Sequence, residues 1–135
     1  MYHKVIIIGN LGNDPQMRYT PEGIPVTTFS VATNRRWTNP DGSPGEETIW
    51  WRVTAWRKLA ETCNQFLSKG RQVYIEAQMR PDPNTGGPRI WTGNDGTARA
   101  SYEVTAITVK FLGARGEPVE VSEESSQGSE EEIPF

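Results

Sequence analysis

The stretch Thr48–Gly70, TIWWRVTAWRKLAETCNQFLSKG, decides the fold because it joins a strand directly to a helix. Its first part, Thr48–Trp56, alternates with the two-residue period of a β-strand. In its second part, Lys58–Ser68, the apolar residues recur at i, i+4, i+7 and i+8, which places them on one face of a helix. Gly70 follows as a residue that can end the helix in a left-handed conformation.

Four further segments have strand patterns: Lys4–Ile8, Pro25–Trp37, Gln72–Arg80 and Ser101–Leu112. Lys4–Ile8 is a continuous β-branched run ended by Gly9 and Gly12, which suits a strand buried on both faces. The helix therefore lies between the third and fourth of five strands, and this order matches the five-stranded OB barrel. We predict an all-β fold with one helix.

Turn-rich stretches separate these strands. Asn39–Gly45 has a high density of turn-forming residues. Pro81–Ala100 contains Asn84–Gly87 and Asn94–Gly96, and we interpret it as a long hairpin arm between strands four and five. The segment Gly9–Pro15 lacks the Gly-Lys-Ser/Thr ending of a phosphate loop and precedes no helix, so we interpret it as a turn.

The charge of the chain is unevenly distributed. The net charge is -3, but residues 1–115 contain all 14 Lys and Arg and only ten of the 17 Asp and Glu. This asymmetry is typical of a basic domain with an acidic tail. After Gly113 the sequence has too few apolar residues to offset the cost of ordering. We predict a domain over 1–113, a disordered acidic linker over 114–129 and a separate tip over 130–135.

Several classes of protein are excluded by composition. No apolar run approaches the roughly 20 residues of a membrane helix, and the apolar stretch within the first ten residues is too short for a secretory signal. One cysteine, Cys63, and one histidine, His3, rule out a disulfide framework and the usual zinc sites. Cys63 fits the core, His3 fits edge packing or an interface, and Glu46 and Glu47 fit solvated loop charges. With no nucleophile motif or nucleotide cradle, we expect neither enzymatic activity nor a cofactor.

Aromatic and cationic side chains alternate with core residues in the third strand. One face, which suits the core, consists of Trp51, Val53 and Ala55, and the other consists of Trp50, Arg52, Thr54 and Trp56. Aromatic rings beside positive charge form a platform for unstacked nucleic-acid bases, each worth about 1–3 kcal/mol. We therefore predict that Trp50, Trp56, Trp37 and Trp91 stack bases, and that Trp51 is structural.

Cations on or beside these segments are candidates for phosphate contact, foremost Arg35, Arg36, Arg52, Lys58 and Lys69. Alternatively, the tryptophans belong to the core or to a subunit contact, where large aromatics are common. Two other functions stay open: an OB module that binds protein, and an OB domain that binds RNA, since stacking does not select the sugar.

The C-terminal tip has the composition of a peptide that docks in a basic, apolar pocket. Its residues are Glu130, Glu131, Glu132, Ile133, Pro134 and Phe135.

The chain resembles the bacterial single-stranded DNA-binding protein family over about 1–113 and at the terminus. The similar pieces are Val5–Pro15, Arg18-Tyr19 with Pro21 and Gly23, Phe29–Thr33, Trp50–Glu61, Leu67, Lys69-Gly70 with Val73–Glu76, and Ile133–Phe135. The resemblance implies an OB fold, usually a homotetramer, that binds single-stranded DNA without strong sequence preference in the bacterial cytoplasm and nucleoid. It maps the family's stacking positions onto Trp37, Trp50, Trp56 and Trp91, with Arg52, Lys58 and Lys69 as DNA-facing cations.

The resemblance also implies a role for the tip, which in the family recruits replication, recombination and repair enzymes and can compete for the DNA groove. Here Glu130–Glu132 stands where the family usually has three aspartates. Three other features depart from the family: the arm Pro81–Arg89 is longer and contains three prolines, the linker is short, and Trp51 replaces a residue that is often polar.

Overall fold

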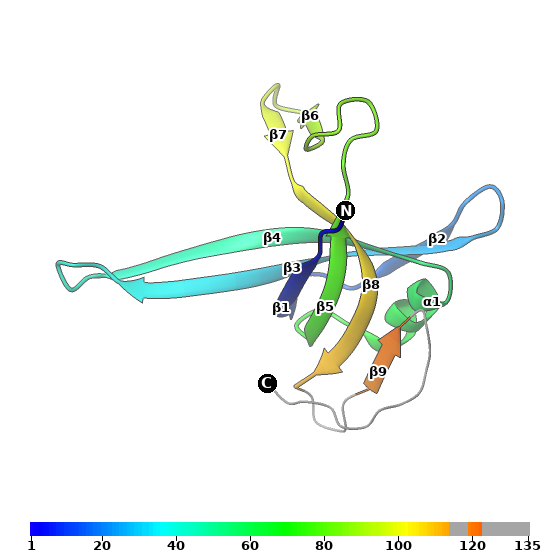
Figure 1. Ribbon diagram of the computed structural model, residues 1–135, viewed down its shortest axis with the longest axis horizontal. Coiled ribbons are helices and arrows are strands. Elements are labelled where there is room, and N and C mark those ends of the chain that lie inside the picture. The colour runs from blue at the N-terminus through cyan, green and yellow to red at the C-terminus, as the bar shows by residue number, and fades with distance from the viewer. Residues whose placement is uncertain (114–118, 123–135) are drawn as a thin grey trace.

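The computed structural model describes residues 1–113 and the backbone of residues 119–122. Five strands close into a barrel: β1 (Val5–Leu11), β3 (Pro25–Thr38), β4 (Pro44–Trp56), β5 (Gln72–Met79) and β8 (Tyr102–Leu112). Their order is β1-β5-β8-β4-β3, and β3 pairs back with β1. Every barrel pairing is antiparallel except that of β4 with β8. The helix α1 (Arg57–Phe66) lies between β4 and β5, so the predicted OB barrel is confirmed (Figure 1).

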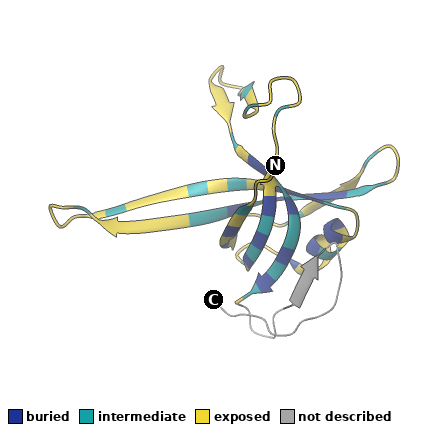
Figure 2. Cartoon of the chain, viewed as in Figure 1, coloured by how far each residue is buried: buried dark blue, intermediate teal, exposed yellow. Residues whose placement is uncertain are grey.

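The core fills the barrel and extends under α1, while the projecting hairpins are exposed (Figure 2). Inward residues of the five strands meet the buried face of the helix, which consists of Leu59, Ala60 and Cys63. Thr27 Oγ1 donates a hydrogen bond of 2.7 Å to the Ala60 carbonyl and ties the helix to β3. Cys63 is fully buried in the core, as predicted, and this burial raises the pKa of its thiol to about 12. No helix in the described part of the chain has the length and apolarity to cross a membrane.

Barrel closure depends on β1 continuing past Gly9 and ending at Leu11, directly before Gly12. β1 includes Gly9 and reaches Leu11, which pairs with Val31 of β3. The backbone of β3 comes so close at Gly9 that an added Cβ would collide with the Ala32 carbonyl oxygen. Gly9 therefore permits the crossing of two strands and does not terminate one.

The outward face of β1 differs from its prediction. Ile7 is buried, but Ile6 and Ile8 are 57% and 39% exposed, so the strand is not buried on both faces within one chain. β1 pairs with β5 from Val5 to Asn10, whereas it pairs with β3 only at its end. One edge of β1, next to two exposed isoleucines, is thus free in the single chain.

Three hairpins project from the barrel (Figure 1). The longest is formed by β3 and β4, which remain paired out to Thr38 and Pro44. The turn is therefore shorter than the predicted Asn39–Gly45, because the strand resumes at Pro44. The predicted arm between β5 and β8 ends in β6 (Ile90–Thr92) and β7 (Ala98–Ala100). The third hairpin contains β2 (Gln16–Tyr19), a strand that was not predicted, which pairs with β3.

A short strand lies within the segment predicted to be a disordered linker. β9 (Val119–Ser122) pairs antiparallel with β8, from Thr108 to Phe111, which corrects that prediction for these four residues. The sequence VEVS alternates with the period of a strand, and this part of β8 lies beyond its pairing with β4, which ends at Thr105. The rest of the predicted linker and the whole tip lie outside the described residues.

Candidate nucleic-acid interface

The four tryptophans predicted to stack bases are all accessible to some degree in the single chain. Trp50 is 54% exposed and Trp37 is 37% exposed, while Trp56 and Trp91 are half-buried. Trp37 lies near the end of β3, Trp50 and Trp56 lie on β4, and Trp91 lies on β6. Within one chain, none of the four is a core residue.

The outward face of β4 brings two of these rings and a cation together. Trp50, Arg52 and Trp56 share this face because side chains alternate along a strand, and Val53 and Ala55 are buried on the other. The Trp50 ring lies over Gly12, where an added Cβ would collide with it. Glycine at position 12 therefore leaves room for the indole against the barrel.

One predicted member of this face is covered. Thr54 is only 2% exposed, and Arg80 Nη1 donates to its hydroxyl at 3.4 Å. Arg80, on the chain leaving β5, thus lies over the face between the two indoles of β4. The exposed aromatic surface is consequently interrupted by a guanidinium.

Trp37 does not share a face with Trp50. Trp37 pairs with Gly45 and Trp50 pairs with Ala32, so the two indoles start from β3 positions five residues apart. Since directly paired residues lie on one face and successive residues alternate, the two rings project from opposite faces of the hairpin. The four rings therefore do not form one flat platform.

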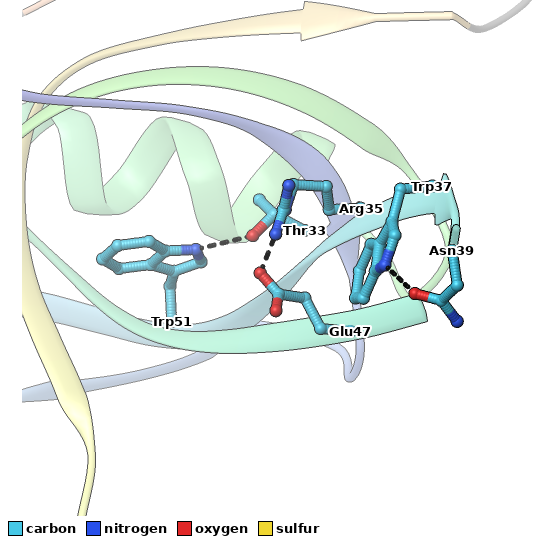
Figure 3. A network of polar contacts seen from close by, with 6 residues as sticks. All are labelled: Thr33, Arg35, Trp37, Asn39, Glu47 and Trp51. Atoms are coloured by element: carbon cyan, nitrogen blue, oxygen red, sulfur yellow. Dashed lines mark hydrogen bonds and ion pairs between the residues drawn. The ribbon is translucent and has the colours of Figure 1, made fainter. Parts of the chain in front are cut away.

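Trp37 belongs to a compact group that we call the Arg35 cluster, consisting of Arg35, Trp37 and Glu47. The Arg35 guanidinium carbon lies 4.7 Å from the indole centroid, and its Nε donates to Glu47 Oε2 at 3.2 Å. Trp37 Nε1 donates to Asn39 Oδ1 at 2.8 Å. Figure 3 shows the ring edge-on, with Arg35 and Glu47 on one side and Asn39 on the other. The ring is thus held in one orientation with a cation against it.

Trp91 belongs to a matching group, the Arg89 cluster, consisting of Arg89, Trp91 and Glu103. The Arg89 guanidinium carbon lies 4.8 Å from the indole centroid, and its Nη1 donates to Glu103 Oε2 at 3.0 Å. The Glu103 side chain is only 8% exposed and also accepts from Ser101 Oγ at 3.1 Å. This cluster joins the arm to the barrel strand β8.

The predicted phosphate-binding cations divide into two kinds. Arg35 and Arg36 each pair with a glutamate across the hairpin, Arg36 with Glu46 at 3.7 Å. Among the ion pairs of the described residues, none involves Arg52 on β4, Lys58 on α1 or Lys69 in the loop before β5. The second group therefore carries the charge that is available to an anion.

Glu46 and Glu47 are exposed charges, as expected, but they lie on the strand β4 opposite arginines and not in a loop. The sequence contains a signal for these pairs. In a hairpin whose turn is centred on Asp41, residues at equal distances from position 41 pair with each other. This places Arg35 opposite Glu47 and Arg36 opposite Glu46. The sequence contains no such signal for Glu103, because its contact with Arg89 depends on how the arm folds back onto β8.

Trp51 occupies the structural position predicted for it. It is half-buried against the core, and its Nε1 donates to Thr33 Oγ1 at 3.0 Å (Figure 3). Its ring also contacts Tyr102 of β8, with centroids 5.5 Å apart and planes tilted by 44°. Tyr102, which is 56% exposed and was not predicted, lines a hollow of about 480 Å³ at the base of the arm.

Other expectations for the site fall outside this surface. The tip residues 130–135 lie outside the described residues. His3 is exposed, and its Nε2 accepts a hydrogen bond of 2.9 Å from the backbone N–H of Met79, so edge packing or an interface stays a prediction for it. Across residues 1–113 there is no group of three His, Cys, Asp or Glu side chains that could hold a metal ion.

Comparison with known proteins gives a consistent result. A model of the single-strand binding protein family matches residues 2–112. The single-stranded DNA-binding protein of Neisseria meningitidis serogroup A is 43% identical over 115 residues, which cover 85% of this chain and 62% of that protein. The protein of the same name from Xanthomonas axonopodis is 41% identical and is covered over 60% of its length. The chain thus spans less than two thirds of these relatives.

Solved structures share the fold. The Plasmodium falciparum SSB in complex with ssDNA superposes with a TM-score of 0.68 at 24% identity, covering 84% of this chain and 97% of that one. The small single-stranded DNA-binding protein from Streptomyces coelicolor gives a TM-score of 0.64 at 23% identity, with the same coverage. At these identities the likeness establishes the OB architecture of the chain.

Proposed function

The chain belongs to the single-strand binding protein family, and from this premise we propose that it binds single-stranded DNA with little preference for sequence. The observation that carries the proposal is the outward face of β4, where Trp50 and Trp56 flank Arg52 on an accessible surface. Indoles and a guanidinium in this arrangement suit stacked bases and the phosphates that link them. Relatives at about 40% identity carry the name of single-stranded DNA-binding proteins.

The proposed mechanism combines two interactions. Each base that stacks on an indole contributes about 1–3 kcal/mol, and every base has a ring face, so affinity depends little on sequence. Arg52, Lys58 and Lys69 neutralise phosphates and release counterions, so salt weakens the complex. Trp37 and Trp91 lie on two of the three projecting hairpins and extend the path of the DNA beyond β4.

Titration with oligo-dT at low salt tests this function through tryptophan fluorescence. Stacking predicts strong quenching, which salt reverses as counterions compete for the phosphates. A matched oligo-U competitor decides between DNA and RNA, and we expect oligo-dT to bind more tightly. Absence of quenching at low salt would contradict the proposal and favour an OB module whose aromatics bind protein.

We further propose that the protein assembles with copies of itself, as a tetramer. The free edge of β1 and the exposed Ile6 and Ile8 support this, because an unpaired strand edge beside apolar side chains is a template for another strand. Mass measurement in solution, with and without oligo-dT, tests the assembly. A monomer at micromolar concentration in both conditions would contradict it.

Finally, we propose that the acidic tip recruits replication, recombination and repair proteins to DNA in the bacterial nucleoid. Its support is chemical: three acids, Glu130–Glu132, precede the apolar residues Ile133, Pro134 and Phe135, a combination that suits a basic pocket with an apolar floor. Deleting Ile133–Phe135 should abolish the capture of such proteins and leave DNA affinity equal or higher. A fall in DNA affinity would show that the tip serves the DNA site itself.

A further inference from the structure

Two of the four indoles are covered in the same way, although they lie on different hairpins. In each case an arginine two residues earlier on the chain lies over the ring, at 4.7 Å for Arg35 and Trp37 and 4.8 Å for Arg89 and Trp91. In each case a glutamate from a different strand accepts from that arginine, Glu47 at 3.2 Å and Glu103 at 3.0 Å. The Arg35 cluster and the Arg89 cluster are therefore two copies of one arrangement.

This arrangement occupies the surface that a base would use. A guanidinium is planar and lies over an aromatic ring much as a base stacks on one. The Trp37 ring also rests against Gly45, where an added Cβ would meet three of its atoms, so Arg35 covers a ring that the backbone already supports. A base that stacks on the covered side has to take the place of the guanidinium.

The glutamates set the charge that a phosphate meets. While Arg35 donates to Glu47, the pair is neutral and offers no net attraction to an anion. The same holds for Arg89 with Glu103. A displaced guanidinium, still on the same hairpin, is free to bind the phosphate next to the stacked base.

We propose that Glu47 and Glu103 are positioning residues that hold Arg35 and Arg89 over Trp37 and Trp91 in the free protein. When a nucleotide binds, the guanidinium leaves the indole and the carboxylate and contacts the phosphate, while the base stacks on the indole. This inference rests on the proposed DNA-binding function. In it, Glu47 and Glu103 control how readily a base stacks on Trp37 and Trp91.

The ion pairs of the two clusters differ in how strongly solvent and salt screen them. Arg35 and Glu47 have side chains that are 67% and 49% exposed, so solvent and salt screen their pair. Glu103 is 8% exposed and holds a second hydrogen bond from Ser101, so its pair with Arg89 is less screened. Trp37 should therefore accept a base more readily than Trp91.

The chain offers a matched test in two adjacent glutamates. Glu47→Gln removes the negative charge that pairs with Arg35, whereas Glu46→Gln removes an equal charge from the pair with Arg36, in which no ring is covered. With oligo-dT, we expect Glu47→Gln to bind about two- to fivefold more tightly than wild type. Its plot of log affinity against log salt should steepen by about 0.7, the value for one additional phosphate contact on a single strand. Glu46→Gln frees a guanidinium but uncovers no ring, so it should raise affinity less than Glu47→Gln does.

The mechanism also predicts that the effect of Glu47→Gln disappears in an Arg35→Ala background, where there is no guanidinium to release. Equal shifts for the two glutamine variants, an unchanged salt slope, or a gain that persists without Arg35 would each overturn the proposal. If wild type itself fails to bind oligo-dT, the proposed function fails instead, and the two failures are thus distinct.

Glu103→Gln tests the second cluster: it removes the negative charge that holds Arg89, while its isosteric amide oxygen can still accept from Ser101. Thermal unfolding verifies that the variant is folded before DNA is added. We expect a larger gain in affinity than for Glu47→Gln, because the pair it breaks is less exposed. A folded Glu103→Gln protein with unchanged affinity would overturn the proposal for Trp91.

Discussion

Trp50 and Trp51 are neighbours in the sequence with opposite environments. Trp50 is 54% exposed over Gly12, whereas Trp51 packs against the core and donates its indole N–H to Thr33. The alternation of a strand is sufficient to produce this difference. Under the proposed function, Trp50 serves binding and Trp51 serves stability.

Replacing each of these tryptophans by alanine should have opposite effects: one variant should mainly lose DNA affinity and the other should mainly lose stability. Trp50→Ala should lower oligo-dT affinity by about 1–3 kcal/mol, the value of one stacked base, with little loss of stability. Trp51→Ala should lower the free energy of unfolding by about 2 kcal/mol or more, because it removes buried ring surface and a hydrogen bond, and it should affect affinity less. Urea unfolding and fluorescence titration measure both quantities. A Trp51→Ala protein with the larger loss of affinity would contradict these assignments.

Gly9 is a residue whose absent side chain matters. Gly9→Ala forces a methyl group into the Ala32 carbonyl, where β1 crosses β3, and should cost about 1–3 kcal/mol of unfolding free energy. Gly87→Ala is the control, since its Cβ would meet only Thr85 Oγ1 at an ordinary 3.7 Å. Urea unfolding of both variants measures the difference. Equal stabilities would mean that β3 yields without cost at the crossing.

Long strands with clear alternation could be predicted from the sequence, and short ones could not. β3, β4, β5 and β8 each carry eight or more residues, which gives the two-residue period room to emerge. β2 and β9 have four residues each and depend on a neighbouring edge, on β3 and β8, which no local pattern specifies. The predicted third strand starts at Thr48 and β4 starts at Pro44, because the polar Glu46 and Glu47 follow a turn-rich stretch and hide the alternation outside the core.

The site shows the same limit. Rings and cations are visible as residue types, so Trp50 and Arg52 could be chosen from the sequence. The pairing that neutralises Arg35 depends on the register of the hairpin, and that of Arg89 depends on where the arm meets β8. Residue types therefore indicate the candidate groups, but they do not show which cations are already paired with a glutamate.

The helix α1 provides a prediction for alkaline pH. Burial raises the pKa of Cys63 from 9.0 to about 12, so the folded state holds this proton more tightly than the unfolded state. Its contribution is fully present below pH 9 and is lost as pH rises from 9 toward 12. Over this window, wild type should lose about 1.4 kcal/mol of unfolding free energy per pH unit more than Cys63→Ala. The variant retains every other titrating group, and parallel curves would show that the thiol does not contribute.

The whole barrel presents two separate surfaces: the aromatic face and hairpins, and the outer side of β1. In the register of β1 with β5, Ile6 stands opposite Glu76 and Ile8 opposite Tyr74, which gives an apolar strip with a polar border. Lys4 pairs with Glu76 at 3.1 Å beside this strip. A second copy that pairs along the β1 edge would cover both isoleucines and leave the outward face of β4 free.

Ile6→Glu tests this separation. A charge at a position that becomes apolar on assembly should reduce the mass in solution, while Tyr19→Glu, on the exposed strand β2, should not. Light scattering measures the mass, and circular dichroism verifies the fold. A variant that keeps the wild-type mass would show that copies meet through another surface.

The same variant should separate the affinities for short and long DNA. A short oligo-dT contacts one subunit, so Ile6→Glu should bind it as wild type does. Long poly-dT bridges several subunits, and each subunit raises the effective concentration of DNA at the next, so loss of assembly should weaken this binding by tenfold or more, since linked sites can gain about 10²–10⁴ in avidity. Fluorescence titration with the two ligands makes the comparison. Equal loss for both would mean that β1 supports the stacking face itself, and equal retention would mean that each subunit holds its DNA independently.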